Sequence, residues 1–425
     1  MKSQGGHFWV WIGLAVLIRV ILMPFTFHGD LFFVHYFPFQ LSHSGIWDVY
    51  GFFEDHYFQR GYTYYGPLIY YVMAFFQWLL GPLDPGFGAF MSGIHERVYA
   101  APFSAMEYVK LFSSKELSYQ LFWMKLPYLF ADVGALVLLR RLFEDPRLKE
   151  KATIFWAFHP VVIFSGAMFG QYRSFTALLL WACLLFFYNK RLLFGAGCIG
   201  LLLLMDSYFP WLLVPVAVLV FGRNFKERIK ISAAIALPYL AVMLPLTVSS
   251  GYVWSIYFSP IARQMAEQSL FHHYVRETVF LCKFVFGAVS LVLLLYLFPT
   301  RTTLSDEQRF RLFCAGSFIL VFTLFATATT HIHYLMWGLP FFFLMDLDKS
   351  PWPRILSVGL FVLLFLFNLN SHAIYFVMPS GLRPLPWFAS SGAWGAVVAS
   401  SRLLFSLLCL YFCYRVWRER VQKLC

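Results

Sequence analysis

Long apolar runs are the feature that most constrains this chain. Apolar segments of roughly 16 to 24 residues recur from one end to the other, about the length that a helix needs to cross a bilayer core. Of the 425 residues, 60% are hydrophobic and only 13% are charged. Inside lipid, only helices and closed barrels satisfy their own backbone groups. The pattern therefore predicts an all-α polytopic membrane protein and excludes a soluble globular chain.

The runs predict about twelve transmembrane helices in one domain over residues 1–425, with both chain ends on the same side. Two long loops, 27–118 and 249–276, are expected on the other side. The apolar stretch 66–80 breaks the alternation, so we expect a re-entrant or surface helix there. The expected crossings lie near 8–26, 119–141, 153–169, 173–188, 192–206, 208–222, 230–248, 277–299, 310–329, 333–348, 353–371 and 393–414.

Basic residues concentrate in alternate connections, such as 140–151 and 223–230. The loop 27–118 contains only a few of them, Arg60, Arg97, Lys110 and Lys115. Because Lys- and Arg-rich connections stay in the cytoplasm, both termini are expected inside. The long loops then lie outside a cytoplasmic membrane, or in the lumen of the endoplasmic reticulum in a eukaryote. This placement accounts for the net charge of +12 without a nucleic-acid partner.

A carboxylate closely follows the first predicted helix. Asp30 begins the long, aromatic outer loop. Such a residue is either a solvated helix cap or a general base that takes the proton from an acceptor hydroxyl. Other polar turns are expected on the same side of the membrane, which favours the second interpretation. Glu54 and Asp55 follow as a second acid or as solvated side chains.

Three charged residues lie inside predicted crossings and need partners. Lys125 and Asp132 are seven positions apart, on one helix face. Arg19 and Lys125 both lie about 10 Å below the outer surface at about 1.5 Å per residue. Two cations at one depth suit either a phosphate or a buried carboxylate such as Asp132, so a structural pair and a substrate site both stay open.

No convincing metal site can be read from the sequence. His331 and His333 point to opposite sides of an extended chain and far apart on a helix, which is poor spacing for two ligands. Cys409 and Cys413 share one helical face and are interpreted as packing residues. We expect no cofactor, although a divalent metal is not excluded.

Five segments, in this order, resemble the GT-C superfamily of integral-membrane glycosyltransferases. The likeness lies in Gly29-Asp30, in the Tyr62 to Leu68 turn, in Lys125-Leu126-Pro127 with Asp132 and Arg140-Arg141, in His159-Pro160 leading to Gly170-Gln171-Tyr172-Arg173, and in His331 to Leu335. The resemblance implies a GT-C-like bundle with a long first extracytoplasmic loop. It also implies that Asp30 matches the family's loop-one acid and that transfer inverts the anomeric carbon.

Two departures separate the chain from many family members. Asp30 is followed by Leu31-Phe32, so the paired acid of several relatives is missing, which weakens any metal assignment. Arg173 stands where many members carry an acid. That arginine either grips a donor phosphate or indicates a different role for this turn.

We therefore expect a polyprenyl-phosphate-dependent hexosyltransferase of the mannosyl- or glucosyltransferase kind. The predicted partners are a polyprenyl-phosphate-linked sugar donor, membrane lipids, and a lipid, glycan or protein acceptor. Asp30 is the predicted base. The predicted phosphate contacts are Arg173, His331, His333, Lys125 and Arg276. The residues expected to line the sugar pocket are Gln171, Asp206, Tyr64 and Tyr65.

Two other functions remain open. A transporter or flippase for lipid-linked saccharides would use the intramembrane Arg19, Lys125 and Asp132 as a substrate path, but no internal repeat is evident. A polymerase or ligase of lipid-linked glycans would also use a long outer loop, with more arginines than Arg263 and Arg276.

Overall fold

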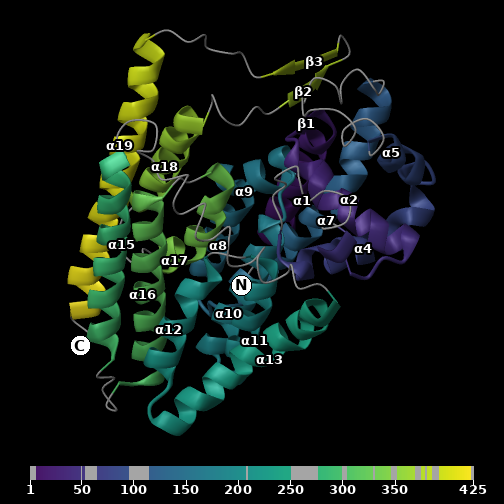
Figure 1. Cartoon of the computed structure of the whole chain (residues 1–425). Coiled ribbons are helices and arrows are strands. Elements are labelled where there is room, and N and C mark those ends of the chain that lie inside the picture. The colour runs from purple at the N-terminus through teal and green to yellow at the C-terminus, as the bar shows by residue number, and fades with distance from the viewer. Residues whose placement is uncertain are drawn as a thin grey trace. The chain divides into compact units, whose positions relative to one another are not determined.

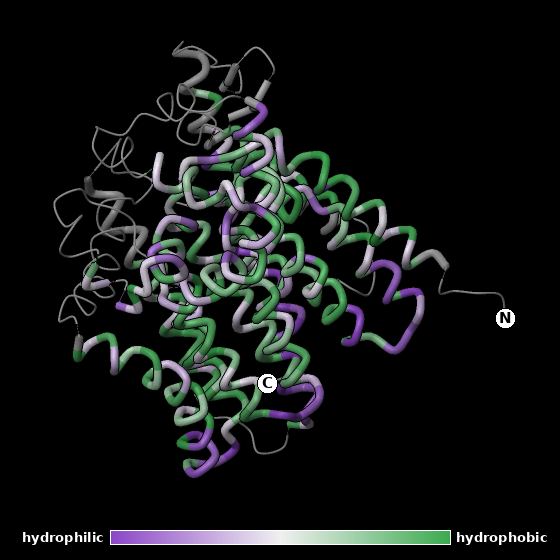
Figure 2. Tube along the Cα trace, turned by 90° about the vertical axis from the view of Figure 1, so that its right-hand side faces the viewer, coloured by the Kyte–Doolittle hydropathy of each residue, from purple (hydrophilic) through white to green (hydrophobic). Residues whose placement is uncertain are grey.

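A computed structural model of the chain describes most of its helices. The described residues are 6–48, 50–52, 65–94, 114–206, 209–249, 276–298, 304–328, 331–345, 352–368, 375–378, 381–384 and 392–422. The described part is almost entirely helical, which confirms the predicted all-α class (Figure 1). Hydrophobic residues fill the helices, and hydrophilic residues lie mainly at helix ends (Figure 2).

The chain divides into two compact units. Unit 1 contains residues 1–178 and 368–394, and unit 2 contains residues 179–367 and 395–425. The single domain over residues 1–425 stays a prediction, and each compact unit has its own helix core.

Unit 1 is built around helix α7 (Ser114–Arg141), which carries Lys125 and Asp132. The N-terminal helix α1 (Gly6–Leu22) leads through the short η1 (Met23–Phe25) to α2 (Asp30–Ser44). The rest of the unit comprises α4 (Pro67–Leu80), η3 (Gly81–Leu83), α5 (Phe87–Ile94), α8 (Pro146–Phe158), α9 (Pro160–Ile163), the π-helix η5 (Phe164–Phe169) and the start of α10 (Arg173–Tyr188).

A small antiparallel sheet links two distant parts of unit 1. Strand β1 (Thr26–Phe27) pairs with β2 (Tyr375–Met378), which pairs with β3 (Gly381–Pro384). In the first pair Thr26 lies opposite Phe376. Strands β2 and β3 belong to the loop expected between the crossings 353–371 and 393–414 (the late loop). This loop meets the start of loop 27–118 next to Asp30, as two loops on one side of a membrane should.

Unit 2 packs its helices around α16 (Asp306–Thr327), which is buried along almost its whole length. The other elements are α11 (Leu192–Met205), α12 (Pro210–Phe221), α13 (Phe225–Ser249), α15 (Arg276–Leu297), η6 (Ile332–Tyr334), α17 (Leu335–Met345), α18 (Trp352–Asn368), α19 (Gly392–Val416) and η7 (Trp417–Val421).

Four helices of the described chain are long and apolar enough to cross a membrane, or five if one bent pair counts as a span. They lie at Phe8–Phe25, Lys115–Arg141, Phe225–Val248 and Asp306–Thr327, and the bent pair is Pro146–Phe158 with Pro160–Phe169. These segments match five of the expected crossings and indicate a multi-pass membrane protein. Most of the other expected crossings appear as shorter apolar helices, so twelve spans are not shown.

Helix α4 does not qualify as a span. It has 14 residues, about 21 Å at about 1.5 Å per residue, which is short of a bilayer core of about 30 Å. It packs along α2 within unit 1. The expected crossing α11 also has only 14 residues, so length does not distinguish the two cases and the re-entrant or surface helix stays a prediction.

In each unit, the helix ends next to basic connections lie close together, as the distribution of Lys and Arg predicts. In unit 1, the Arg140 guanidinium lies 3.7 Å from the centre of the Phe8 ring, and Trp11 donates to Glu150. The start of α1 thus lies beside the basic connection 140–151, whereas Asp30 follows the other end of α1. The predicted inner and outer ends of this unit are therefore distinct.

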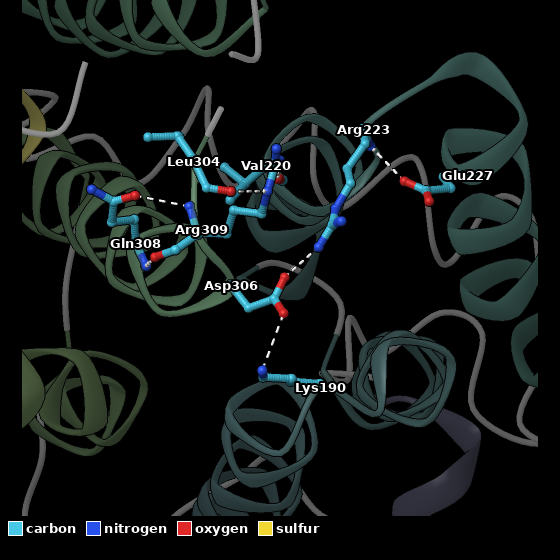
Figure 3. A network of polar contacts seen from close by, with 9 residues as sticks. Lys190, Val220, Arg223, Glu227, Leu304, Asp306, Gln308 and Arg309 are labelled. Carbon is cyan, nitrogen blue, oxygen red and sulfur yellow. Dashed lines mark hydrogen bonds and ion pairs between the residues drawn. The ribbon is translucent and has the colours of Figure 1, made fainter. Parts of the chain in front are cut away.

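In unit 2, Asp306 joins three of the predicted inner connections. Its carboxylate accepts from Arg223 and lies 3.3 Å from the Lys190 ammonium (Figure 3). Arg309 donates to the Val220 carbonyl at 2.6 Å, and Ser305 and Gln308 form a capping box at the start of α16. The connections after α10, after α12 and before α16 therefore meet at one end of unit 2.

Candidate functional site

Asp30 is placed at the first turn of α2 by the short strand before it. Pro24 starts the tight η1 turn at the end of α1, and β1 then carries the chain to Gly29, the residue that caps α2. A carboxylate in the first helical turn interacts favourably with the positive end of the helix dipole. The Asp30 side chain remains 35% exposed, so a substrate can reach it.

Gln171 holds the Asp30 carboxylate, and His28 holds the Asp30 backbone. Its Oδ2 accepts a hydrogen bond from Nε2 of Gln171 at 2.8 Å. Its Oδ1 lies 3.5 Å from Nδ1 of His28, and this nitrogen accepts from the Asp30 backbone N–H at 3.2 Å. An Nδ1 that accepts a backbone N–H carries no proton. Burial lowers the pKa of His28, against the opposing effect of the Asp30 charge, so the imidazole is neutral at pH 7.

The His28 ring is itself held in place. It stacks on Phe169, with ring centres 4.1 Å apart and planes 16° from parallel. Sequence reasoning overlooked His28. A histidine two residues ahead of a helix's first acid can cap that helix in the way an Asp or Asn side chain does, and the His28-Gly29-Asp30 order is the signal that could have identified it.

Gly170 determines where Gln171 lies. It ends η5 with a φ of 79°, in the left-handed region that glycine adopts without strain. A Cβ at this position would lie 2.8 Å from Leu31 Cδ1 and 3.2 Å from Lys125 Cε. Both the turn and the close approach therefore require glycine here. The next backbone N–H, that of Gln171, donates to the Ser165 carbonyl at 2.9 Å and turns its side chain toward Asp30.

Tyr65 completes the surroundings of Gln171. Its ring packs edge-on against Tyr172 at 4.8 Å, and its backbone carbonyl accepts from the Tyr50 hydroxyl at 2.6 Å. Burial and then the nearby Asp30 carboxylate raise the pKa of Tyr65 well above its usual value, while a hydrogen bond with Gln171 and the charge of Arg173 oppose the shift. The Tyr65 hydroxyl is therefore protonated and available as a donor.

Arg173 brings positive charge to the same place. It is the first residue of α10, it is buried, and its guanidinium lies over the Tyr172 ring, 4.3 Å from the centre. The structure thus gathers four of the predicted residues in unit 1: Asp30, Gln171, Tyr65 and Arg173.

Lys125 was predicted to contact a phosphate, but in the structure it binds backbone carbonyls. Its buried ammonium donates to the backbone carbonyls of Met23, Thr26, Ala167 and Met168. These carbonyls belong to the segment leading to Asp30 and to the π-helix leading to Gln171. The arrangement favours a structural role, in which Lys125 ties together the two segments that carry the site.

The other two intramembrane charges form the structural pair that the sequence left open. Arg19 Nε lies 3.2 Å from Asp132 Oδ2, and both side chains are buried. The same guanidinium donates to the carbonyls of Ala15 and Ala157. Arg19 and Asp132 are therefore engaged inside unit 1.

Three more predicted residues belong to unit 2. Asp206 is fully buried at the end of α11, and His331 and His333 begin and lie within η6. The Phe209 ring stacks on Trp337 at 5.2 Å, and Trp337 stacks on Tyr334 at 4.4 Å. These aromatic contacts join the Asp206 turn to the His331 turn.

The structure does not describe the side chains of the remaining predicted residues. Tyr64, Glu54, Asp55 and Arg263 lie outside the described residues. Arg276 is the first residue of α15, and its side chain is likewise not described. Among the described residues, no group of three or more His, Cys, Asp or Glu side chains is arranged to hold a metal ion.

The arrangement in unit 1 suits proton abstraction beside an anionic leaving group. It offers a partly exposed carboxylate, an amide that orients it, a phenol donor and a buried cation. No protein-family model matches the chain, and no curated protein sequence matches it.

Proposed function

We propose that the chain is an integral-membrane glycosyltransferase of the GT-C type that takes a hexose from a polyprenyl-phosphate carrier. The observation that carries the proposal is the Asp30 carboxylate, which lies past the end of a membrane-length helix, is open to substrate and is oriented by Gln171. In this proposal, the shorter apolar helices complete the twelve crossings and the reaction takes place at the outer face.

The proposed reaction is a single displacement. Asp30 accepts the proton of an acceptor hydroxyl as that oxygen bonds to the anomeric carbon. The bond between this carbon and the phosphate oxygen breaks on the opposite side, so the configuration inverts and polyprenyl phosphate leaves. Gln171 keeps Oδ2 of Asp30 in place, and the second oxygen faces the incoming hydroxyl.

The charges around Asp30 support this division of roles. Arg173, at the positive end of α10, suits the negative charge that grows on a leaving phosphate. The Tyr65 hydroxyl, protonated because of burial and the Asp30 charge, suits a sugar oxygen. For Asp206, His331, His333 and Arg276, contacts with the donor remain predictions.

The transporter alternative finds less support. It needs Arg19, Lys125 and Asp132 as binding groups along a path, yet Arg19 pairs with Asp132 and Lys125 donates to backbone carbonyls. The geometry of unit 1 therefore favours chemistry at Asp30 over passage through this helix group.

The test is transfer by purified protein in nanodiscs. A panel of radiolabelled polyprenyl-phosphate hexoses is supplied with a membrane-lipid extract, with and without a chelator. We expect transfer from at least one donor, with inversion and with no loss when the chelator is added. An absence of turnover with every donor, together with movement of lipid-linked saccharide across liposomes, would replace the enzyme with a transporter.

A further inference from the structure

One exposed face of α13 in unit 2 changes from cationic to apolar along the helix. Its exposed residues recur at intervals of four or seven positions: Lys226, Lys230, Leu237, Leu244 and Val248. At about 100° per residue, all five lie within about 40° of one another around the helix axis. The last three are 72%, 52% and 88% exposed. The face therefore starts with two ammonium groups and continues as a stripe of hydrocarbon.

The length of α13 places these two parts at different depths of a bilayer. The helix is one of the described segments that are long and apolar enough to cross a membrane, and only 28% of its apolar window is buried inside the protein. Lys230 precedes Leu237 by seven residues, about 10 Å at about 1.5 Å per residue. The headgroup layer on each side of a bilayer is about 5–8 Å thick. When Leu237 lies among lipid chains, Lys226 and Lys230 therefore lie among headgroups, at the end predicted to be cytoplasmic.

Helix α11 brings a third cation to the same end of unit 2. Helix α12 returns the chain from the end of α11 to the start of α13, so α11 and α13 run in the same direction. The two pack closely, and a Cβ on Gly197 would lie 3.9 Å from the Ala234 carbonyl oxygen. Arg191, the exposed residue that precedes α11, lies about 9 Å before Gly197, and Lys230 lies about 6 Å before Ala234. Arg191 and the two lysines therefore share one end of this helix pair.

The charged groups around this end divide into two sets. Arg223 and Lys190 pair with Asp306 (Figure 3), and Arg228 donates to two backbone carbonyls. Glu227 accepts from the Arg223 backbone N–H. In contrast, the side chains of the three exposed cations make no hydrogen bond or ion pair with any residue that the structure describes. Their positive charge is therefore not balanced by the nearby carboxylates.

The combination of free cations and an apolar stripe selects the partner. Ammonium and guanidinium groups form strong hydrogen bonds with phosphate oxygens. Lys226 and Lys230 repel each other as like charges four positions apart, and a bound anion relieves that repulsion. A soluble anion would leave the apolar stripe unused, whereas a lipid chain covers it. We propose that this end of α11 and α13 binds an anionic phospholipid, with its phosphate at the cations and a chain along the α13 stripe. The site does not depend on transfer at Asp30.

Native mass spectrometry of the full-length protein tests the site with two probes that carry the same acyl chains. The probes are phosphatidylglycerol, which is anionic, and phosphatidylcholine, which has no net charge. We expect phosphatidylglycerol to bind at least fivefold more tightly. Lys226→Gln and Lys230→Gln should each weaken its binding about fivefold, the factor expected for one cation near an anionic lipid surface. Both side chains are exposed, so the melting temperature in phosphatidylcholine should not change.

Arg311→Gln is the matched control. It removes the same charge near the start of α16, but this arginine already pairs with Glu307 at 2.6 Å. We expect phosphatidylglycerol binding to change less than twofold. Equal affinity for the two lipids would overturn the proposal, as would an equal loss in Arg311→Gln and the lysine variants, which would show a response to net charge alone. Hexose transfer can be present or absent in either case.

Discussion

At the scale of single residues, the site depends on how two backbone segments are held together. Gly170 allows the turn that presents Gln171, and Lys125 binds carbonyls on both segments. The sequence pattern predicted Asp30, Gln171 and Arg173 as site residues. It could not predict the use of Lys125, because a lysine within an apolar run looks the same whether its partners are backbone carbonyls or a phosphate.

Gly170→Ala should destabilise unit 1. The positive φ strains an alanine, and its Cβ would press on Leu31, so we expect a loss of about 1–3 kcal/mol. Melting in detergent, followed by intrinsic fluorescence, measures the change. Gly13→Ala is the control, because a Cβ there meets nothing within 4 Å. Equal melting temperatures for the two variants would refute the role given to Gly170.

Lys125→Met separates the structural role from phosphate binding. It leaves buried carbonyls without their donor, so we expect a loss of about 3–5 kcal/mol in stability. The control is Lys115→Met, at an exposed position on the same helix. An unchanged melting temperature combined with a raised KM for the donor would restore Lys125 as a phosphate contact.

At the scale of elements, proline and glycine explain where the structure departs from simple helical runs. The predicted crossing 153–169 is bent by 46°, because His159 adopts an extended conformation before Pro160 and caps the next helix. The His159-Pro160 order was available as a signal for this break. The π-helix η5, which contacts α7, had no such signal in the sequence.

Helix α2 should make the protein sensitive to acid. Burial lowers the pKa of His35 to about 3. Below about pH 6.5 the His35 imidazole is protonated in the unfolded chain but stays neutral in the folded chain. The folded state therefore loses stability as the pH falls from 6.5 toward the folded pKa. Between pH 7 and pH 5 we expect a loss of about 2 kcal/mol from this group.

The acid sensitivity is measured as melting temperature against pH. His35→Gln should flatten the curve between pH 7 and pH 5, whereas replacing the exposed His43 of the same helix should keep most of the slope. Burial raises the pKa of Asp84, so this carboxyl acts in the opposite direction at lower pH. An unchanged slope in His35→Gln would show that His35 titrates normally.

At the scale of the whole molecule, the charge pattern predicted which connections share an end. Within unit 2, Asp306 joins the connections that contain Lys190 and Arg223. Within unit 1, the start of α1 meets the 140–151 connection, and β1 meets the late loop. The division into two units could not be predicted from the sequence. The apolar pattern of a helix indicates that one face is buried, but it does not indicate which neighbouring helix covers that face.

Thiol labelling in intact cells tests the predicted orientation of the chain in the membrane. Ser44→Cys, at the exposed last residue of α2, should react with a membrane-impermeant maleimide. Asn189→Cys, in the exposed connection beside Lys190, should react only after the cells are opened. The unsubstituted protein sets the background from its own cysteines. Labelling of Asn189→Cys alone in intact cells would invert the orientation.

We propose Asp30 as the base of a hexosyl transfer, and a comparison of kcat for two carboxylate variants is the sharpest test of that role. Asp30→Asn keeps the shape and can still accept from Gln171, but it cannot take the proton, so we predict a loss of about 10²–10⁴-fold in kcat with an unchanged melting temperature. Asp48→Asn, in the same outer loop, keeps its acceptor for the Gly51 N–H and should retain full activity. Full activity in Asp30→Asn would contradict the account and remove this carboxylate from the chemistry.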